Sequence, residues 1–280
     1  MKGSSYLYLH LSVALFGLAG LFGRWLNLAP IQIVQGRTFI AAISFLIVLL
    51  ISRRFQFHKL RFYRNTAILG LVLAFHWIAF FEAIQKTSIA LALLSFASFP
   101  FFTLVIEWLL KQEVFRKLDL FLVILSLIGT ALIIPWERGE SDLAGFIWGL
   151  ASGLSFAILT ILNRRFVKKA KAIDLAFHQD FFAALVLLPF SLFLDWTLNL
   201  DDIGLLLLLG TLFTAVSHLL FVTALMKVPA KTAALIAALE PVYGIIAAYF
   251  FFAEIPLASS VLGGILILGA GLIAQIRVPT

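Results

Sequence analysis

The chain has no cysteine among its 280 residues, which excludes disulfides, thiolate metal ligands and cysteine nucleophiles. Charge is also scarce. Only 12% of the residues are charged, whereas 62% are hydrophobic and the mean hydropathy is +1.08. A soluble domain is about half apolar and about one quarter charged. This composition therefore predicts a protein whose main solvent is lipid.

Sequence signals of several other chemistries are absent too. The chain has no phosphate-binding loop, dinucleotide fingerprint or zinc-ligand spacing, and its five histidines are scattered. We therefore expect no cofactor, no metal and no catalytic residue, and we predict that the protein is not an enzyme. The net charge of +7 lies in short loops beside apolar runs, where it faces anionic lipid. It does not indicate a nucleic-acid partner.

Ten apolar stretches follow one another along the chain. A helix needs about 20 apolar residues to cross a bilayer, so the sequence predicts an all-α integral membrane protein with ten transmembrane helices. The first stretch is too long for the core of a signal peptide, and we expect it to remain as an uncleaved span. The expected spans are 7–26, 31–51, 66–85, 89–110, 119–135, 145–162, 175–194, 203–225, 232–252 and 258–276.

The basic residues lie on alternate connections, and this alternation reverses at mid-chain. Residues 27–30 contain no Lys or Arg, whereas their counterpart 163–174 contains five; residues 52–65 contain five, whereas 195–202 contain none. Basic loops stay in the cytoplasm, which predicts two oppositely oriented halves and cytoplasmic N- and C-termini. Among the 21 Lys and Arg the exceptions are Arg24, Arg37, Lys86 and Arg138.

An internal repeat predicts the same inversion. One constant offset along the chain aligns Pro100 with Pro241 and Glu113 with Glu254. Each half holds five stretches, an odd number, so the second half must be inverted. We therefore expect two five-helix repeats, 1–140 and 141–280. Inverted repeats are typical of secondary carriers, with the substrate site near the membrane midplane.

The chain resembles the EamA-type members of the drug/metabolite transporter superfamily. Each half has a proline at the same spacing before the acid of Leu-Leu-Lys-Gln-Glu113 or Phe-Phe-Ala-Glu254, and Glu240-Pro241-Val242 resembles a recurrent motif of the family. Arg37 lies where the family often has an arginine. The first half departs from the pattern, because Phe99 replaces the acid before Pro100. The resemblance implies a carrier of the bacterial inner membrane that exports amino acids, metabolites or drugs.

Ionisable groups inside a bilayer are expensive and are therefore candidates for function. Glu240 lies near the midplane before Pro241, which can open the helix. It could bind a substrate ammonium or a proton, or it could hold the kink by bonding to another helix. His76 could bind substrate or take up a proton, and Trp77 offers a flat apolar face. The repeat places His218 opposite Trp77.

Arg37 needs a partner at its depth in the membrane, because a guanidinium does not lose its charge. Glu82 of the neighbouring hairpin is one candidate, and a substrate carboxylate is the other. Glu82 is also a candidate for proton coupling, but Lys86 follows it at i+4, so an interfacial ion pair is the alternative.

Three further residues are substrate-binding candidates. Gln179 corresponds to Arg37 by symmetry, Ser98 could face the pore or bond carbonyls freed by Pro100, and Trp148 could line a cavity or belong to an interfacial belt. We expect His178 and Asp180 to lie in the first cytoplasmic turn of their helix, where they serve the interface rather than the site.

These features predict a secondary transporter that moves a small amphiphilic metabolite by alternating access. An amino acid is the leading substrate and export the expected direction. Proton coupling and proton-independent diffusion remain alternatives, and the oligomeric state stays open. Rival interpretations are an uptake carrier or exchanger on the same fold, and a polytopic membrane enzyme acting on lipid-linked substrates.

Overall fold

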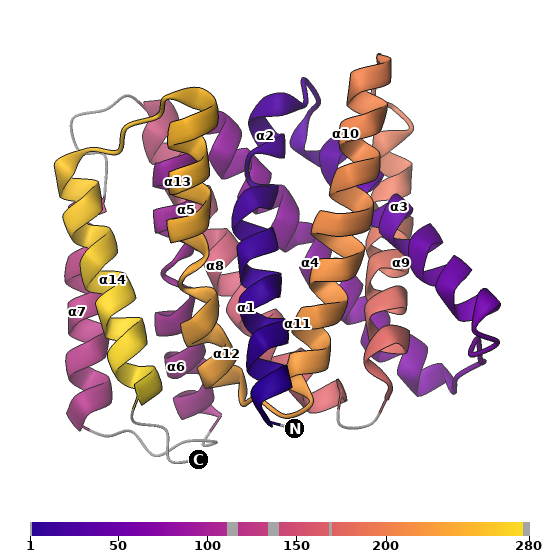
Figure 1. The fold of residues 1–280 in the computed structure, drawn as a ribbon, viewed down its shortest axis with the longest axis horizontal. Coiled ribbons are helices and arrows are strands. Elements are labelled where there is room, and N and C mark those ends of the chain that lie inside the picture. Colours follow the sequence, from indigo (N-terminus) through magenta and orange to yellow (C-terminus); the bar gives the residue numbers. More distant parts are fainter. Residues whose placement is uncertain (1, 111–116, 134–139, 168–169, 277–280) are drawn as a thin grey trace.

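The chain folds entirely into helices over the residues that a computed structural model describes, which are 2–110, 117–133, 140–167 and 170–276 (Figure 1). No strand occurs in these ranges. This confirms the all-α prediction. Glu113 and Arg138 lie outside the described residues. The elements are α1 (Lys2–Ala19), α2 (Phe22–Trp25), α3 (Pro30–Ile51), α4 (Leu60–Lys86), α5 (Ile89–Phe96), α6 (Phe99–Leu109), α7 (Lys117–Ile133), α8 (Glu140–Phe166), α9 (Ala172–Ser191), α10 (Leu200–Gly210), the π-helix η2 (Thr211–Val216), α11 (Ser217–Leu225), α12 (Ala230–Ala237), α13 (Glu240–Phe252) and α14 (Ala258–Ile276).

Each of the ten apolar stretches lies on helix, and the protein is a multi-pass membrane protein. By length and composition, seven helical segments of the described chain can each cross a bilayer. The segments Glu240–Phe252 and Ala258–Ala270 are apolar but shorter. The seven are Ser4–Trp25, Pro30–Ile51, Leu60–Lys86, Ile89–Leu109, Glu140–Phe166, Ala172–Ser191 and Leu200–Leu225.

Two of the expected spans are interrupted next to a proline. Helix α5 ends before α6 begins, with Pro100 in the first turn of α6, and α12 ends before α13 begins, with Pro241 in the first turn of α13. Proline fits there because the N–H it lacks would have no helical partner. Helix α13 packs beside α5, and α12 packs beside α6. The two broken helices therefore run in opposite directions (Figure 1).

The helix boundaries recur along the chain. Helices α5 and α12 have the same length, and their starts at Ile89 and Ala230 are related by the offset of the internal repeat. The same offset relates the starts of α7 and α14. Their packing recurs as well, because α8 contacts α4 and α5 while α1 contacts α11 and α12. These helices of the two halves therefore pack in equivalent pairs.

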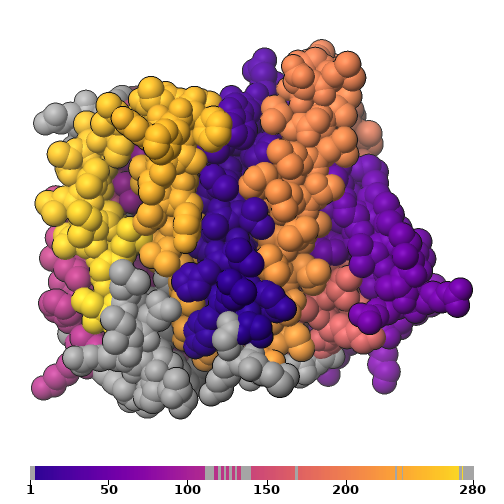
Figure 2. Space-filling view, in the orientation of Figure 1, coloured from indigo at the N-terminus to yellow at the C-terminus, as the bar shows by residue number. Residues whose placement is uncertain are grey.

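Helix α1 runs along the middle of the face shown in Figure 2, between α12–α13 and α10–α11. It approaches α13 closely because Gly17 has no side chain. A methyl group on Gly17 would lie 2.6 Å from the carbonyl oxygen of Glu240 and 3.1 Å from the nitrogen of Gly244. Small residues allow such contacts between transmembrane helices. The contact fixes α1 against the point where the α12–α13 helix is broken.

Candidate functional site

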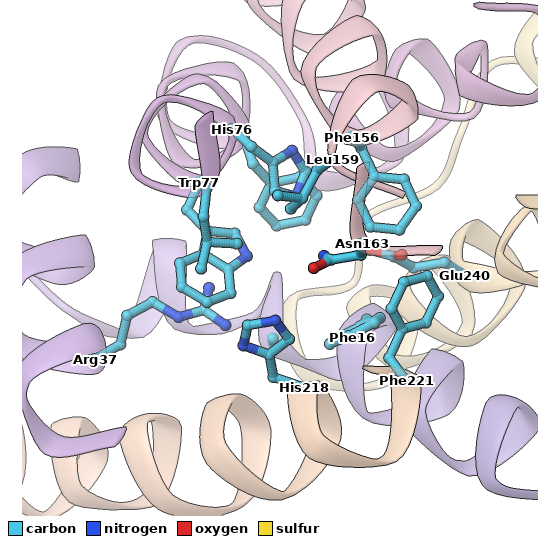
Figure 3. A pocket seen from close by; sticks show the side chains of 13 residues that line it. Phe16, Arg37, His76, Trp77, Phe156, Leu159, Asn163, His218, Phe221 and Glu240 are labelled. Atoms are coloured by element: carbon cyan, nitrogen blue, oxygen red, sulfur yellow. The ribbon is translucent and has the colours of Figure 1, made fainter. Parts of the chain in front are cut away.

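Five of the predicted site residues meet at one buried cavity between the two halves. Arg37, His76, Trp77, His218 and Glu240 line it, and each side chain is buried (Figure 3). The free space is about 30 Å³, which holds one or two water molecules rather than a metabolite. A substrate can therefore enter only if the surrounding helices move apart. Much of the remaining wall is aromatic and comes from Phe16, Phe80, Phe156 and Phe221.

The lining of the cavity follows the internal repeat. Trp77 and His218, which the offset of the repeat pairs, meet edge to face with ring centroids 6.1 Å apart. Phe80 and Phe221, which are related by the same offset, also line the cavity. Equivalent positions of the two halves therefore face one another across it.

Arg37 projects from α3 and is held by its neighbours on one side. Its Nε donates to Thr214 Oγ1 at 2.9 Å, Nη2 donates to the carbonyl oxygen of Phe213 at 3.3 Å, and Cζ lies 4.0 Å from the Trp77 ring centroid. Nη1 forms no hydrogen bond with any described residue, which leaves donors for a ligand. Thr214 lies in the π-helix η2, and such insertions are frequent at functional sites.

Glu240 begins α13 on the side of the cavity opposite Arg37 (Figure 3). Its side chain is buried, yet its carboxylate forms no hydrogen bond or ion pair with the part of the chain that the structure describes. Arg37 and Glu240 interact electrostatically but do not form an ion pair with each other. An unpaired cation and an unpaired anion therefore face the same small space.

His76 is tied to α8. Its Nδ1 lies 3.1 Å from the carbonyl oxygen of Ser152 and 3.0 Å from Ser152 Oγ, which also lies 3.2 Å from the carbonyl oxygen of His76. Its ring centroid is 5.2 Å from that of Phe156. These contacts fix the imidazole at the cavity wall.

Two polar pairs were not foreseen. Asp180 was expected at the cytoplasmic interface, which is wrong. Helix α9 begins at Ala172, so Asp180 lies more than two turns inside and is fully buried, with Oδ2 2.9 Å from His218 Nδ1. Gln179 forms a reciprocal amide pair with Asn163, at 2.8 and 3.2 Å. Asn163 itself lines the cavity.

Besides Gln179, three predicted residues do not line the cavity. Of the two candidate partners of Arg37, Glu82 does not pair with it; Glu82 instead forms the alternative i+4 pair with Lys86, at 3.4 Å near the end of α4. Ser98 donates to the carbonyl oxygen of Ser95 at 2.8 Å within the turn between α5 and α6. Trp148 packs against Phe75, with ring centroids 6.4 Å apart. These three side chains therefore contact other residues and do not line the cavity.

A polar network lies at the end of the bundle at which α2 is found (Figure 1). Arg24 Nε lies 3.7 Å from Glu254 Oε1, and Arg24 Nη2 donates to the carbonyl oxygen of Thr87. Thr87 Oγ1 in turn donates to Asp142, and the backbone N–H of Ile89 donates to Glu254 Oε2 at 2.9 Å. The network therefore links α2 and α8 to the start of α5 and to the segment that follows α13.

A solved crystal structure has the same fold. It aligns with 99% of this chain and 100% of its own, with a TM-score of 0.73 and 17% sequence identity. At that identity the likeness shows the fold alone.

Sequence comparison identifies the family. The EamA-like transporter family model matches residues 3–134 and again residues 143–274. An Archaeoglobus fulgidus transporter is 31% identical, over 75% of this chain and 76% of its own. The Bacillus subtilis transporter YxxF is 24% identical (88% and 81%), and the S-adenosylmethionine uptake transporter of Rickettsia bellii is 28% identical (72% and 69%). The family and these relatives are transporters rather than enzymes. The chain therefore belongs to the EamA-like transporter family.

Proposed function

We propose that the protein is a secondary carrier that moves a small zwitterionic metabolite, an amino acid with an apolar side chain, by alternating access. The observation that carries this proposal is the unpaired Arg37 and the unpaired Glu240 on opposite sides of one aromatic cavity. A guanidinium binds a carboxylate through two parallel hydrogen bonds, and a buried carboxylate binds an ammonium. The aromatic wall would cover the apolar part of the substrate.

The architecture we propose has ten membrane crossings in two inverted repeats, residues 1–140 and 141–280. Support comes from the two family matches, the recurring helix boundaries and the opposite directions of the two broken helices. In this scheme the repeats rock about the cavity and expose it to each side in turn. The basic loops place both termini in the cytoplasm of a bacterial-type inner membrane.

A binding experiment on the purified protein tests the substrate class. Three probes separate the two charges: L-phenylalanine carries both, phenethylamine carries only the ammonium, and 3-phenylpropionate carries only the carboxylate. A ligand at 100 times its Kd stabilises a protein by about 2.7 kcal/mol. We expect L-phenylalanine to raise the melting temperature more than either half-probe does. Equal shifts for all three, or no shift for any of them, would contradict the proposal.

Uptake of S-adenosylmethionine is a second candidate, since several relatives bear that name. Its amino-acid end has the same two charges, and its sulfonium would lie against aromatic rings. The family resemblance predicts export instead. Counterflow in vesicles of known orientation, with labelled L-phenylalanine or S-adenosylmethionine, distinguishes the substrates. Net flux from whole cells then distinguishes uptake from export.

A further inference from the structure

Asp180 and His218 form a buried acid–base pair at the cavity wall, where His218 is part of the lining. Asp180 is 0% and His218 3% exposed, and Asp180 Oδ2 lies 2.9 Å from His218 Nδ1. The other polar atom of each group, Asp180 Oδ1 and His218 Nε2, is buried and has no hydrogen-bond partner among the described residues. Buried polar atoms normally have partners, because leaving one unpaired costs about 1–3 kcal/mol. A neutral imidazole whose Nδ1–H is bonded to a carboxylate keeps a free lone pair on Nε2.

The pair is linked electrically to the substrate-binding cation. Asp180 of α9 and Glu240 of α13 both act electrostatically on Arg37 of α3, while His218 of α11 acts on His76 of α4. His218 also lines the cavity through its contact with Trp77. Among the described residues, the charged and titratable groups in this electrostatic network besides the pair are Arg37, Glu240 and His76. A charge added to the pair is therefore felt at Arg37.

We propose that Asp180 and His218 form the proton site of the carrier. The pair binds a proton at the same time as Arg37 binds the substrate carboxylate. This inference rests on the proposed function. A proton from water on one side of the membrane forms an N–H bond at His218 Nε2, and it returns to water on the other side. No electrons are transferred.

The other candidates are engaged elsewhere. Glu82 is paired with Lys86 near the end of its helix, and the Nδ1 atom of His76 lies against Ser152. Glu240 is the group available for the substrate ammonium. Asp180 and His218 differ because they are bonded to each other and because each leaves one buried polar atom without a partner among the described residues.

Electrostatics fixes the sign of the coupling. A proton on the pair adds one positive charge near Arg37, which strengthens the binding of a carboxylate there. By reciprocity the bound carboxylate strengthens proton binding by the same factor. Proton and substrate therefore move in the same direction, and a pH gradient accumulates the substrate on the alkaline side.

Proteoliposomes containing L-phenylalanine as the probe test this directly. With one proton per substrate, a gradient of one pH unit corresponds to about 1.36 kcal/mol and supports an accumulation of about tenfold. We expect accumulation near tenfold for the natural protein and for the control His10→Asn. We expect a ratio near one for Asp180→Asn, while the natural protein, the control and this variant all still exchange labelled for unlabelled substrate. The amide that replaces the Asp180 carboxylate can still bond to His218 but carries no charge.

The possible outcomes separate the two proposals. Failure of the natural protein to exchange the probe would count against the proposed substrate class. Unchanged accumulation in Asp180→Asn, or accumulation on the acidic side, would overturn the proton site. Histidine ¹⁵N resonances of the ligand-free protein give a readout that needs no transport. The His218 signal, identified by its loss in His218→Asn, should shift as the pH is varied; a signal that does not respond would also overturn the proposal.

Discussion

At the scale of single residues, Glu240 faces the cavity because of the proline that follows it. Pro241 ends the helical path from α12, so the chain turns at Leu239 and Glu240 begins a new helix. A helix start carries partial positive charge, which favours a carboxylate there. The first half has the same break but carries Phe99 at the equivalent position. Only one of the two breaks therefore offers a charge to a ligand.

Replacing this charge should remove binding without unfolding the protein. Glu240→Gln keeps the volume of the side chain but loses a charge-assisted hydrogen bond worth about 1.5–3 kcal/mol, so L-phenylalanine should bind about 10 to 150 times more weakly by calorimetry. Glu82→Gln is the matched control, because Glu82 lies away from the cavity and pairs with Lys86. Its Kd should stay within about twofold. Equal losses in both variants would mean that Glu240 has no special role.

The hydroxyl of Thr214 should be required to hold Arg37. Thr214→Val has a similar shape but leaves the buried Nε of Arg37 without its acceptor, at a cost of about 1–3 kcal/mol. We expect a melting temperature lower by several degrees and weaker binding of 3-phenylpropionate. Thr211→Val serves as control in the same π-helix, since Thr211 is exposed and bonds only to the carbonyl oxygen of Leu207 among the described residues. A similar loss in the control would point to damage of the π-helix instead.

The sequence predicted which kinds of residue lie at the cavity, but it did not predict their partners. Depth within an apolar stretch identified Arg37, His76, Trp77, His218 and Glu240. Asp180 was misplaced because the start of its helix was set three residues too late, which moved a fully buried acid to the interface. Partners depend on how helices rotate against each other, and hydropathy carries no information about that.

At the scale of helices, close contact between α1 and α13 depends on the missing side chain of Gly17. Gly17→Ala would place a methyl group 2.6 Å from a backbone carbonyl oxygen, which cannot move aside as a side chain can. Overpacking of this kind costs about 1–3 kcal/mol. We therefore expect a lower melting temperature and impaired exchange, because the contact lies beside Glu240.

Gly204 provides the control for this prediction. It lies in α10 with no atom within 4 Å of an added methyl group. Gly204→Ala should be neutral or stabilising by up to about 1 kcal/mol, because alanine favours helix more than glycine does. If both variants melted at the same temperature, the close contact of Gly17 would have no energetic weight.

The positions of the helices were largely predictable, and their irregularities only partly so. Apolar runs located the helices, and Pro100 and Pro241 indicated where two of them could open. The π-helix of residues 211–216 was not predicted, because no proline or glycine pattern distinguishes Thr-Leu-Phe-Thr-Ala-Val from ordinary helix. In the structure, Thr214 of this π-helix donates to the carbonyl oxygen of Leu209 and accepts from Arg37 Nε.

At the scale of the whole molecule, the inverted arrangement that we propose places equivalent positions of the two halves on opposite sides of the membrane. Ser52 follows α3, and Phe193, its equivalent in the internal repeat, lies just beyond the end of α9; both are exposed. The chain has no cysteine, so Ser52→Cys and Phe193→Cys can be labelled without background. We expect an impermeant maleimide to label Phe193→Cys in intact cells and Ser52→Cys only after permeabilisation. Labelling of both from one side would contradict the inverted topology.

The charge pattern predicts the orientation, and the structure accounts for most of its exceptions. Arg24 and Lys86 break the rule that basic residues lie in cytoplasmic loops, and each is paired with an acid, Glu254 or Glu82. Arg37 breaks it because it belongs to the cavity. The rule counts charges along the chain and therefore misses those neutralised by residues brought close in folding.

The narrowness of the cavity also matters to the cell when no substrate is present. A transporter with a polar centre would dissipate the membrane potential if ions could pass through that centre. Here the central space of about 30 Å³ is lined in large part by phenylalanine rings. A space of that size is too small to hold a continuous file of water for hydrated ions to follow. The empty protein can thus remain in the membrane as an insulator.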